Sequence, residues 1–212
     1  YKLAGKFVKN AAEATDRCDS SVAEGTCARS LKPGEGLASL AWRWPWSTAM
    51  PLRFNHMELS LPPGEYGGRA VHDLFVGRLD WDAHPYFQGI RGLQVSAHFF
   101  ITRKGALWQF VDCDQRAWHA GRSSYRGRME CNDDSVGIEL EGLEGLHFEP
   151  AQYTALAQLC KDLALRYPIA HVAGHEHIAP GRKADPGAGF DWPRLQGLLG
   201  WAPERFPATI SP

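Results

Sequence analysis

The sequence has no long hydrophobic run and no excess of charge of either sign. No apolar stretch approaches the roughly 18 residues that a transmembrane helix needs, so we expect no membrane span. The 23 lysines and arginines nearly balance 24 aspartates and glutamates, which leaves a formal net charge of −1. A chain without a global positive field has no general attraction for nucleic acid or anionic membrane, and we expect neither as a partner.

Cysteine is also scarce, and its pattern does not indicate a disulfide scaffold. The five residues contain no C-x-x-C pair: Cys18, Cys27, Cys113, Cys131 and Cys160. The chain does not open with a charged region followed by an apolar one, so the sequence shows no secretion signal. These features favour reduced thiols in a cytoplasmic protein.

The composition is that of an ordinary globular protein, with 44% hydrophobic and 22% charged residues in a chain of 212. Residues 1–50 show little sustained periodicity. Near their end Trp42, Trp44 and Trp46 alternate, which indicates an extended segment that either packs on the domain or forms an aromatic patch. We therefore divide the chain into an N-terminal segment, 1–50, and one domain, 51–212.

Periodicity in the second part predicts both strands and helices. Residues 95–101 and 106–111 predict a hairpin, because two apolar runs flank the turn residues Arg103-Lys104-Gly105. Residues 135–141 alternate apolar and polar side chains, which is typical of a half-buried strand. A stripe at steps of three and four predicts a helix that begins near Pro150 and ends before Pro168: Tyr153, Leu156, Cys160, Leu163 and Tyr167.

The sharpest cluster of chemically active side chains spans residues 174–187. His175 and Asp185 lie at either end of one Gly- and Pro-rich loop and offer nitrogen and oxygen donors of the kind that zinc accepts. A solvated loop that happens to contain these residues is the alternative.

Glu139 is a candidate general base, because it lies on a predicted strand and shares a face with Glu141. The alternative for either glutamate is a solvent-facing strand edge. A third cluster, residues 116–121, combines Arg116, Trp118 and His119 beside a glycine. It could line a groove for a sugar or a peptide, or its tryptophan could simply cover the core.

Several motifs occur in an order that resembles one family. They are Ser60-Leu-Pro-Pro-Gly64, Val95-Ser-Ala-His98, Arg116-Ala-Trp-His-Ala-Gly121, Cys131-Asn-Asp133, Gly137-Ile-Glu-Leu-Glu-Gly142, Gly174-His175 and Ile178-Ala-Pro-Gly-Arg-Lys-Ala-Asp-Pro-Gly187. Together they cover about residues 57–195 and resemble the cytoplasmic AmpD-type amidases, which are N-acetylmuramoyl-L-alanine amidases specific for 1,6-anhydro-muropeptides.

The resemblance implies a peptidoglycan-recognition fold related to phage T7 lysozyme, an α/β fold with a central mixed β-sheet flanked by helices. It implies one Zn²⁺ held by two histidines and an aspartate, of which His175 and Asp185 are two. Glu139 and Lys183 would be the catalytic residues. His98, Arg116, Trp118 and His119 are the candidate substrate-binding residues. The implied reaction is hydrolysis of the amide between N-acetylmuramic acid and L-Ala of muropeptides in peptidoglycan recycling.

The first zinc histidine departs from the pattern. In the family it stands three residues before the serine of the Leu-Pro-Pro loop, where this chain has Met57, and His56 lies one residue too early. A bulge that absorbs one residue would restore the direction of His56, and we take it as the third ligand. His177 replaces a usual aspartate and is either a substitute ligand or a residue that orients His175.

Two functions remain open from the sequence. The first is a zinc amidase, and the second is a muropeptide-binding module whose zinc site is defective. Glu139, Lys183, His175 and Asp185 are all present, and a pure binder needs no such set, which favours the enzyme.

Overall fold

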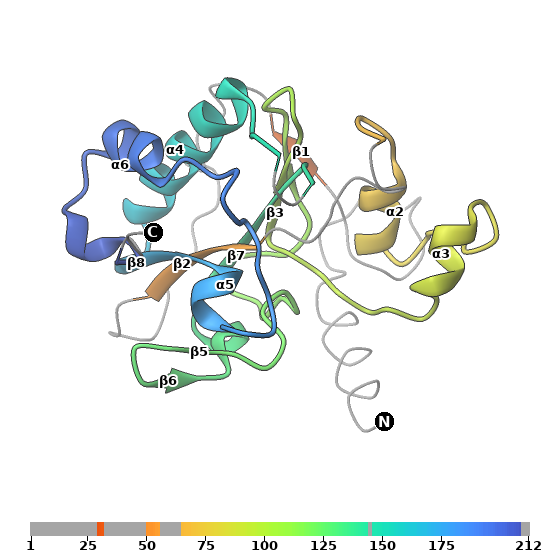
Figure 1. The fold of residues 1–212 in the computed structure, drawn as a ribbon, viewed down its shortest axis with the longest axis horizontal. Coiled ribbons are helices and arrows are strands. Elements are labelled where there is room, and N and C mark those ends of the chain that lie inside the picture. The colour runs from red at the N-terminus through yellow and green to blue at the C-terminus, as the bar shows by residue number, and fades with distance from the viewer. Residues whose placement is uncertain (1–28, 32–49, 56–64, 144–145, 209–212) are drawn as a thin grey trace.

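The protein is described by a computed structural model that covers residues 29–31, 50–55, 65–143 and 146–208. Its centre is a six-stranded mixed sheet with the order β1-β4-β3-β7-β2-β8. The strands are β1 (Arg29–Leu31), β2 (Met50–Asn55), β3 (Phe99–Ile101), β4 (Leu107–Gln109), β7 (Val136–Leu140) and β8 (Ile169–Gly174). Helices lie on both sides of this sheet (Figure 1), which confirms the expected mixed α/β class.

Four strands, β3, β7, β2 and β8, run parallel to one another, while β4 and β1 continue the sheet in antiparallel fashion. The β3–β4 pair is the predicted hairpin, closed by a bond from the amide of Gly105 to the Thr102 carbonyl at 2.8 Å. Gly105 has φ of 78°, and a Cβ there would come within 2.8 Å of the Ala151 carbonyl oxygen. The turn therefore depends on glycine.

One face of the sheet packs against helix α4 (Pro150–Ala164) and helix α6 (Trp192–Leu199). Proline occupies the first turn of α4 and the helix ends before Pro168, as the sequence predicts. The stripe at steps of three and four is buried there: Tyr153, Leu156, Cys160 and Leu163. It meets Val136, Ile138 and Leu140 of β7 in the main hydrophobic core.

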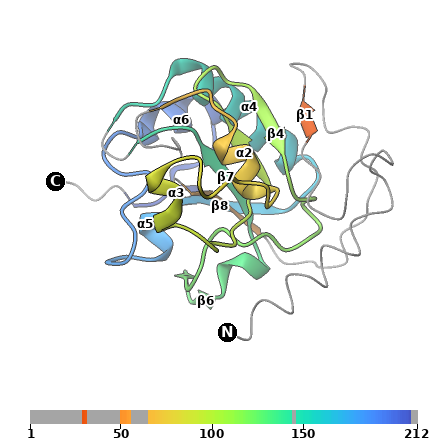
Figure 2. The same cartoon turned by 90° about the vertical axis from the view of Figure 1, so that its right-hand side faces the viewer.

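A second core lies on the other face, under α2 (Ala70–Phe75) and α3 (Pro85–Gly89), which Figure 2 shows in front of the sheet. Strand β3 serves both cores, because Phe99 and Ile101 belong to the first and Phe100 to the second. This alternation follows from the period of two along a strand. Strands β3 and β7 are buried on both faces, so the expectation of a half-buried strand at 135–141 is wrong.

Strand β2 lies between β7 and β8, where a run of aliphatic residues would be usual. Its sequence, Met-Pro-Leu-Arg-Phe-Asn, is less apolar than that. The pairing with β8 shifts register between Met50 and Pro51, which is where a proline can be accommodated in a sheet. The backbone pairing of β2 therefore forms in spite of its composition.

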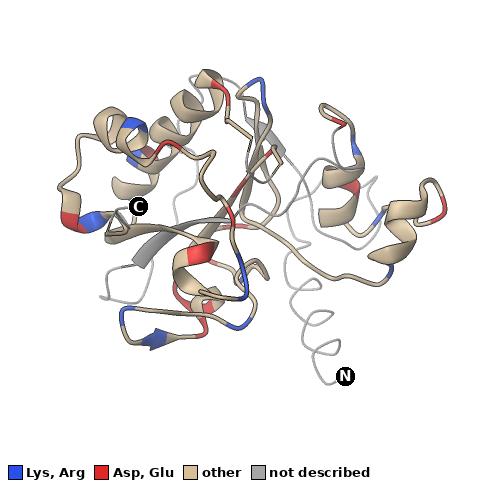
Figure 3. Ribbon diagram, in the orientation of Figure 1, with Lys and Arg blue, Asp and Glu red and all other residues tan. Residues whose placement is uncertain are grey.

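The remaining elements surround the ends of the sheet. They are the hairpin β5 (Ser124–Tyr125) and β6 (Arg128–Met129), the 3₁₀ turns η3 (Cys131–Asp133) and η4 (Pro203–Arg205), and the short helix α5 (His175–Ile178). Charges of both signs are spread over these elements (Figure 3). Among the residues that the structure describes, no helix is long and apolar enough to cross a membrane.

Candidate active site

Glu139 and His175, two of the predicted site residues, lie at the carboxyl ends of parallel strands. Phe54 of β2 pairs with Gly174 of β8, and Asn55 pairs with Glu139 of β7. Helix α5 begins at His175, directly after β8. The topology thus brings Glu139 and His175 to the two strands that flank β2, at the edge where sites of parallel sheets commonly form.

The loop from Gly174 to Pro186 folds back on itself. The amide of Glu176 donates to the Asp185 carbonyl at 2.8 Å, which joins the two ends of the loop. A Cβ at Gly174 would come within 2.5 Å of the Pro186 ring, so the close approach requires glycine. This closure carries Asp185 to the start of α5.

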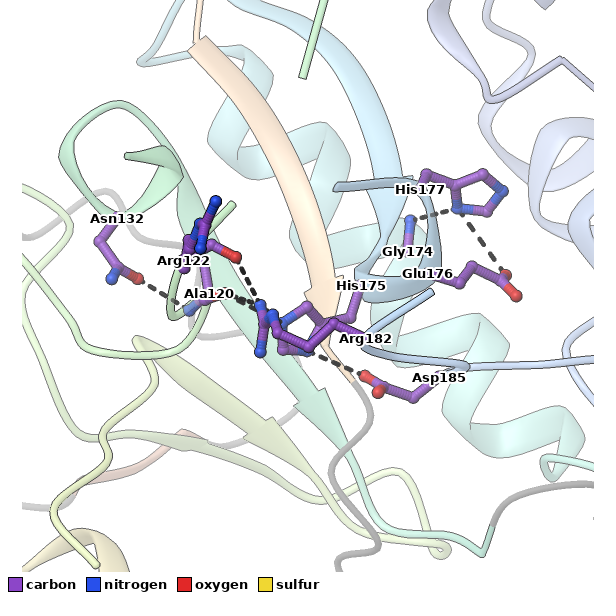
Figure 4. Close-up of polar contacts among 9 residues, drawn as sticks. All are labelled: Ala120, Arg122, Asn132, Gly174, His175, Glu176, His177, Arg182 and Asp185. Carbon is purple, nitrogen blue, oxygen red and sulfur yellow. Dashed lines mark hydrogen bonds and ion pairs between the residues drawn. The ribbon is translucent and has the colours of Figure 1, made fainter. Parts of the chain in front are cut away.

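His175 and Asp185 form a buried pair. Nδ1 of His175 lies 3.2 Å from Oδ2 of Asp185, and the two residues are 2% and 7% exposed. Figure 4 shows the two side chains pointing toward each other from α5 and from the end of the loop. The alternative of a solvated loop is therefore wrong for these two residues.

The other nitrogen of His175 is held by the backbone. Nε2 lies 3.0 Å from the carbonyl oxygen of Ala120, which can only accept a hydrogen bond, so Nε2 is the donor. Nη2 of Arg182 donates to the Ala120 carbonyl at 2.9 Å and to the Arg122 carbonyl at 2.7 Å. Nη2 of Arg182 also lies 3.3 Å from Nε2 of His175, but its two hydrogens are taken by the nearer Ala120 and Arg122 carbonyls. Nε2–H therefore remains the donor to Ala120, and Nδ1 faces the carboxylate.

Glu139 is buried on the face of β7 opposite the main core. It is 1% exposed, and Ile138 and Leu140 on either side of it point into the core under α4. Glu141 is buried as well, and its carboxylate accepts the amides of Gly67 at 2.5 Å and Arg103 at 2.8 Å. A solvent-facing strand edge is therefore the wrong interpretation for both glutamates.

Lys183 lies on the same loop as Asp185 and is partly buried. Its amide donates to the Ala179 carbonyl at 3.0 Å, which continues the turn after α5. The loop thus carries Lys183 two residues before the Asp185 carboxylate.

His177 turns away from the His175–Asp185 pair. Its Nδ1 accepts the amide of Gly174 at 3.0 Å, and its ring packs edge-on against Trp192. Figure 4 shows the ring of His177 on the far side of α5 from Asp185. The structure therefore does not bring His177 into the pair, and its bond to Gly174 fixes the residue before His175. His56 and Met57 lie outside the described residues.

Arg116 and Trp118 form a stacked unit near the hairpin β5–β6. The Arg116 guanidinium lies 4.1 Å from the centre of the Trp118 ring and pairs with Asp133 at 2.8 Å. The amide of Trp118 donates to the Ser96 hydroxyl at 3.0 Å. Both side chains are partly exposed, and a substrate contact by either stays a prediction.

The rings of His98 and His119 lie 5.5 Å apart, edge to face. Nδ1 of His98 accepts the amide of Gly137 at 2.9 Å, and Nε2 lies 3.0 Å from the Gln115 carbonyl. Burial lowers the pKa of His98 to about 4, against the smaller opposing effect of the Gln115 bond. This geometry gives His98 a structural role between β3 and β7, and its contact with substrate stays a prediction.

The ring of His119 lies over Gly137, where a Cβ would overlap it. The absence of a side chain at Gly137 therefore makes room for His119 on the polar face of β7. The ring's contact with substrate is likewise still a prediction.

Within the ranges that the structure describes, no group of three or more histidine, cysteine, aspartate or glutamate side chains is gathered as a metal site. The donors observed together are the imidazole of His175 and the carboxylate of Asp185.

Sequence reasoning missed the roles of Arg182 and Asn132. Arg182 holds the same carbonyl as His175, and Oδ1 of Asn132 accepts the amides of His119 at 3.1 Å and Ala120 at 2.8 Å. Both residues belong to motifs of the resemblance. A side chain that bonds to backbone twelve residues away has no periodic or local signal that would reveal it.

Comparison with known proteins agrees with this geometry. Residues 70–188 match the family described as N-acetylmuramoyl-L-alanine amidase. The chain is 53% identical over 143 residues to the 1,6-anhydro-N-acetylmuramyl-L-alanine amidase AmpD of Citrobacter freundii, which covers 66% of this chain and 76% of that protein.

Solved structures of similar proteins share the fold. The crystal structure of a selenomethionine derivative of AmpD has a TM-score of 0.68 and 51% identity, with 72% of this chain and 86% of that chain covered. AmiD from Escherichia coli, in complex with the substrate anhydro-N-acetylmuramic acid-L-Ala-D-γ-Glu-L-Lys, has a TM-score of 0.54 and 29% identity, with 74% and 60% covered.

The family match spans more than half of the chain, and the AmpD relative is matched over three quarters of its length. The mixed sheet flanked by helices and the order of the motifs agree with both. The chain therefore belongs to the N-acetylmuramoyl-L-alanine amidase family and is an amidase.

Proposed function

We propose that the protein is a zinc-dependent amidase of cytoplasmic peptidoglycan recycling. Its substrate would be a 1,6-anhydro-muropeptide, and the bond cut would be the amide between N-acetylmuramic acid and L-Ala. The single observation that carries the zinc assignment is the buried His175–Asp185 pair. The substrate assignment is supported by the similarity to AmpD and to the substrate complex of AmiD.

The donor geometry of the pair fits zinc. With Nε2–H committed to the Ala120 carbonyl, Nδ1 presents a lone pair to the Asp185 carboxylate 3.2 Å away. Two acceptors at this distance repel each other unless a proton or a metal cation lies between them. Donors about 2.0–2.2 Å from a tetrahedral zinc stand roughly 3.3 Å from each other, which is close to the observed separation.

A third donor is proposed from the chain that follows β2. The β2 strand ends at Asn55, whose backbone pairs with Glu139, and His56 is the next residue. Three protein ligands and one open position are the pattern of a catalytic zinc. We therefore keep His56, His175 and Asp185 as the proposed ligand set.

Zinc bound there would lower the pKa of a water and polarise the carbonyl of the scissile amide. The Glu139 carboxylate accepts the proton of the attacking water as the new C–O bond forms. It then delivers that proton to the nitrogen of L-Ala as the C–N bond breaks. The ammonium of Lys183 stabilises the negative charge that develops on the carbonyl oxygen. Arg116 and Trp118 would contact the muropeptide beside the site.

The alternative is a muropeptide-binding module without hydrolysis. The joint presence of Glu139, Lys183, His175 and Asp185 argues against it, because a pure binder needs no such set. A binder would retain muropeptide without cutting it.

The test of the zinc assignment is the metal content of the dialysed protein. We expect about one zinc per chain in the parent, as one catalytic site requires. Asp185→Ala should lose both the metal and the hydrolysis of a 1,6-anhydro-muropeptide. The matched control is Asp82→Ala, an exposed aspartate in the α2–α3 region, which should keep both. A full equivalent of tightly held zinc in Asp185→Ala would remove Asp185 from the ligand set.

A further inference from the structure

The carbonyl of Ala120 fixes the orientation of His175. It accepts hydrogen bonds from Nε2 of His175 at 3.0 Å and from Nη2 of Arg182 at 2.9 Å. Ala120 itself is fully buried. A histidine that donates one ring nitrogen to a carbonyl presents the other nitrogen in a set direction and in one tautomer. The direction in which Nδ1 faces Asp185 therefore depends on where the Ala120 peptide lies.

The Ala120 peptide lies in a segment without regular secondary structure, so no strand ladder holds it. Its position comes from Asn132, whose Oδ1 accepts the amides of both His119 and Ala120, at 3.1 and 2.8 Å. One buried oxygen thus binds two consecutive amides, and the carbonyl of the second residue binds His175. Figure 4 shows this line of contacts from Asn132 through Ala120 to His175 and Asp185.

Asn132 is itself held in place. It is the middle residue of η3, and the turn before it is tied to Ser123 at two points. The amide of Glu130 donates to the Ser123 carbonyl at 3.0 Å, and the amide of Cys131 donates to the Ser123 hydroxyl at 3.2 Å. Asn132 is 4% exposed, so bulk water cannot replace the amides of His119 and Ala120 at its side chain. The 3₁₀ turn therefore acts as a rigid base for the contact with residues 119 and 120.

From these contacts we infer that Asn132 is a positioning residue for the metal ligand His175, acting through the backbone of Ala120. This inference rests on the proposed function, which makes His175 a zinc ligand. Outer partners of this kind typically change metal affinity by about 10–100-fold when they are removed.

The test replaces Asn132 by leucine, which keeps the volume and removes the acceptor. The matched control is Gln152→Leu. Gln152 is also a fully buried amide bonded to backbone, with Nε2 2.9 Å from the Glu141 carbonyl, but it lies on α4 in the opposite layer. A merely structural role would give the two variants the same zinc affinity at equal loss of stability.

In zinc titrations of the metal-free proteins against a chelating dye, Asn132→Leu should raise the zinc Kd by about 10–100-fold. Gln152→Leu should keep the Kd of the parent, and Asn132→Asp, which retains an Oδ1 acceptor, should recover most of the affinity. If Asn132→Leu fails to fold, Asn132→Ser replaces it, because its hydroxyl is too short to reach both amides. Equal zinc affinity in the Asn132 and Gln152 variants would overturn the inference.

A second measurement separates this inference from the zinc assignment. In the metal-free parent, the Nε2–H of His175 should give a proton NMR signal protected from exchange with water, because it is bonded to a buried carbonyl. Gln152→Leu should keep this signal and Asn132→Leu should lose it. A parent that binds no zinc but shows this dependence would refute the zinc proposal and leave the positioning role standing. A signal that survives in Asn132→Leu would refute the positioning role.

Discussion

The two faces of strand β7 bury side chains of different kinds, apolar on one face and mainly polar on the other. Val136, Ile138 and Leu140 point into the core under α4, where only apolar volume is needed. Gly137, Glu139 and Glu141 point the other way, and all three are also buried. On this polar face Gly137 makes room for the His119 ring, and Glu141 accepts two backbone amides.

The difference shows how one strand can serve stability and chemistry at once. A buried apolar residue contributes through area and packing, so its loss is felt mainly as free energy of unfolding. A buried polar residue needs specific partners, so its loss affects the few groups that it contacts. Changes on the two faces should therefore separate into effects on folding and effects on hydrolysis.

The largest effect is expected from Glu139→Gln. The variant keeps the size of the side chain and removes the proton acceptor, so hydrolysis of a 1,6-anhydro-muropeptide should fall by about 10²–10⁴-fold in kcat/KM. Zinc content and thermal unfolding should stay near those of the parent. Turnover close to the parent's would remove Glu139 from the mechanism and make Glu141 the next residue to test.

Ile138→Ala changes the adjacent residue on the other face. The cavity under α4 should cost about 2–5 kcal/mol in the free energy of unfolding, measured by urea denaturation. The kcat of the protein that remains folded should be nearly unchanged. A large loss of kcat at full folding would contradict the separation of the two faces.

Acidification should lower the stability of the folded protein through His98. Burial lowers the pKa of folded His98 to about 4, while its usual value in an unfolded chain is 6.5. Between these values the unfolded chain binds a proton that the folded chain does not. The contribution of His98 to the free energy of unfolding is therefore fully present above pH 6.5 and is lost as the pH falls toward 4.

This linkage amounts to about 2.5 kcal/mol between roughly pH 7 and pH 4.5. Urea denaturation of the parent and of His98→Gln at both pH values measures it. The variant should lose less stability on acidification than the parent by this amount. An equal loss in both proteins would mean that His98 does not carry the effect.

Gly137→Ala should destabilise the protein by about 1–3 kcal/mol, which is typical of overpacking. The new Cβ would overlap the His119 ring and push it off the polar face. Gly197→Ala, at a position in α6 with open space, is the control and should not destabilise the protein. Calorimetric melting of the two variants compares them, and equal melting temperatures would show that His119 moves without cost.

Much of this arrangement follows from local sequence signals. The stripe from Tyr153 to Leu163 and the proline at position 150 were sufficient to predict α4, and the turn at 103–105 to predict the β3–β4 hairpin. The alternation at 136–141 correctly separated Glu139 and Glu141 from Ile138 and Leu140. It did not reveal that both faces are buried, because burial depends on what packs from distant parts of the chain.

Other features have no local signal. The composition of residues 50–55 is poor for a central strand, yet parallel pairing with β7 and β8 gives the segment that position. The distance between His175 and Asp185 depends on closure of the loop from Gly174 to Pro186. The contact from Asn132 to the Ala120 amide joins two irregular segments, so only the folded structure reveals it.

The central proposal is that the polar face of β7 and the start of α5 form the active site, where the amidase cuts muropeptides next to the sugar. The most direct test is mass spectrometry of the products formed from 1,6-anhydro-N-acetylmuramoyl-L-Ala-D-γ-Glu-L-Lys with the zinc-loaded parent. The account predicts two products, free 1,6-anhydro-N-acetylmuramic acid and an intact tripeptide with a new amino terminus at L-Ala. An intact substrate, or cleavage within the peptide, would contradict it.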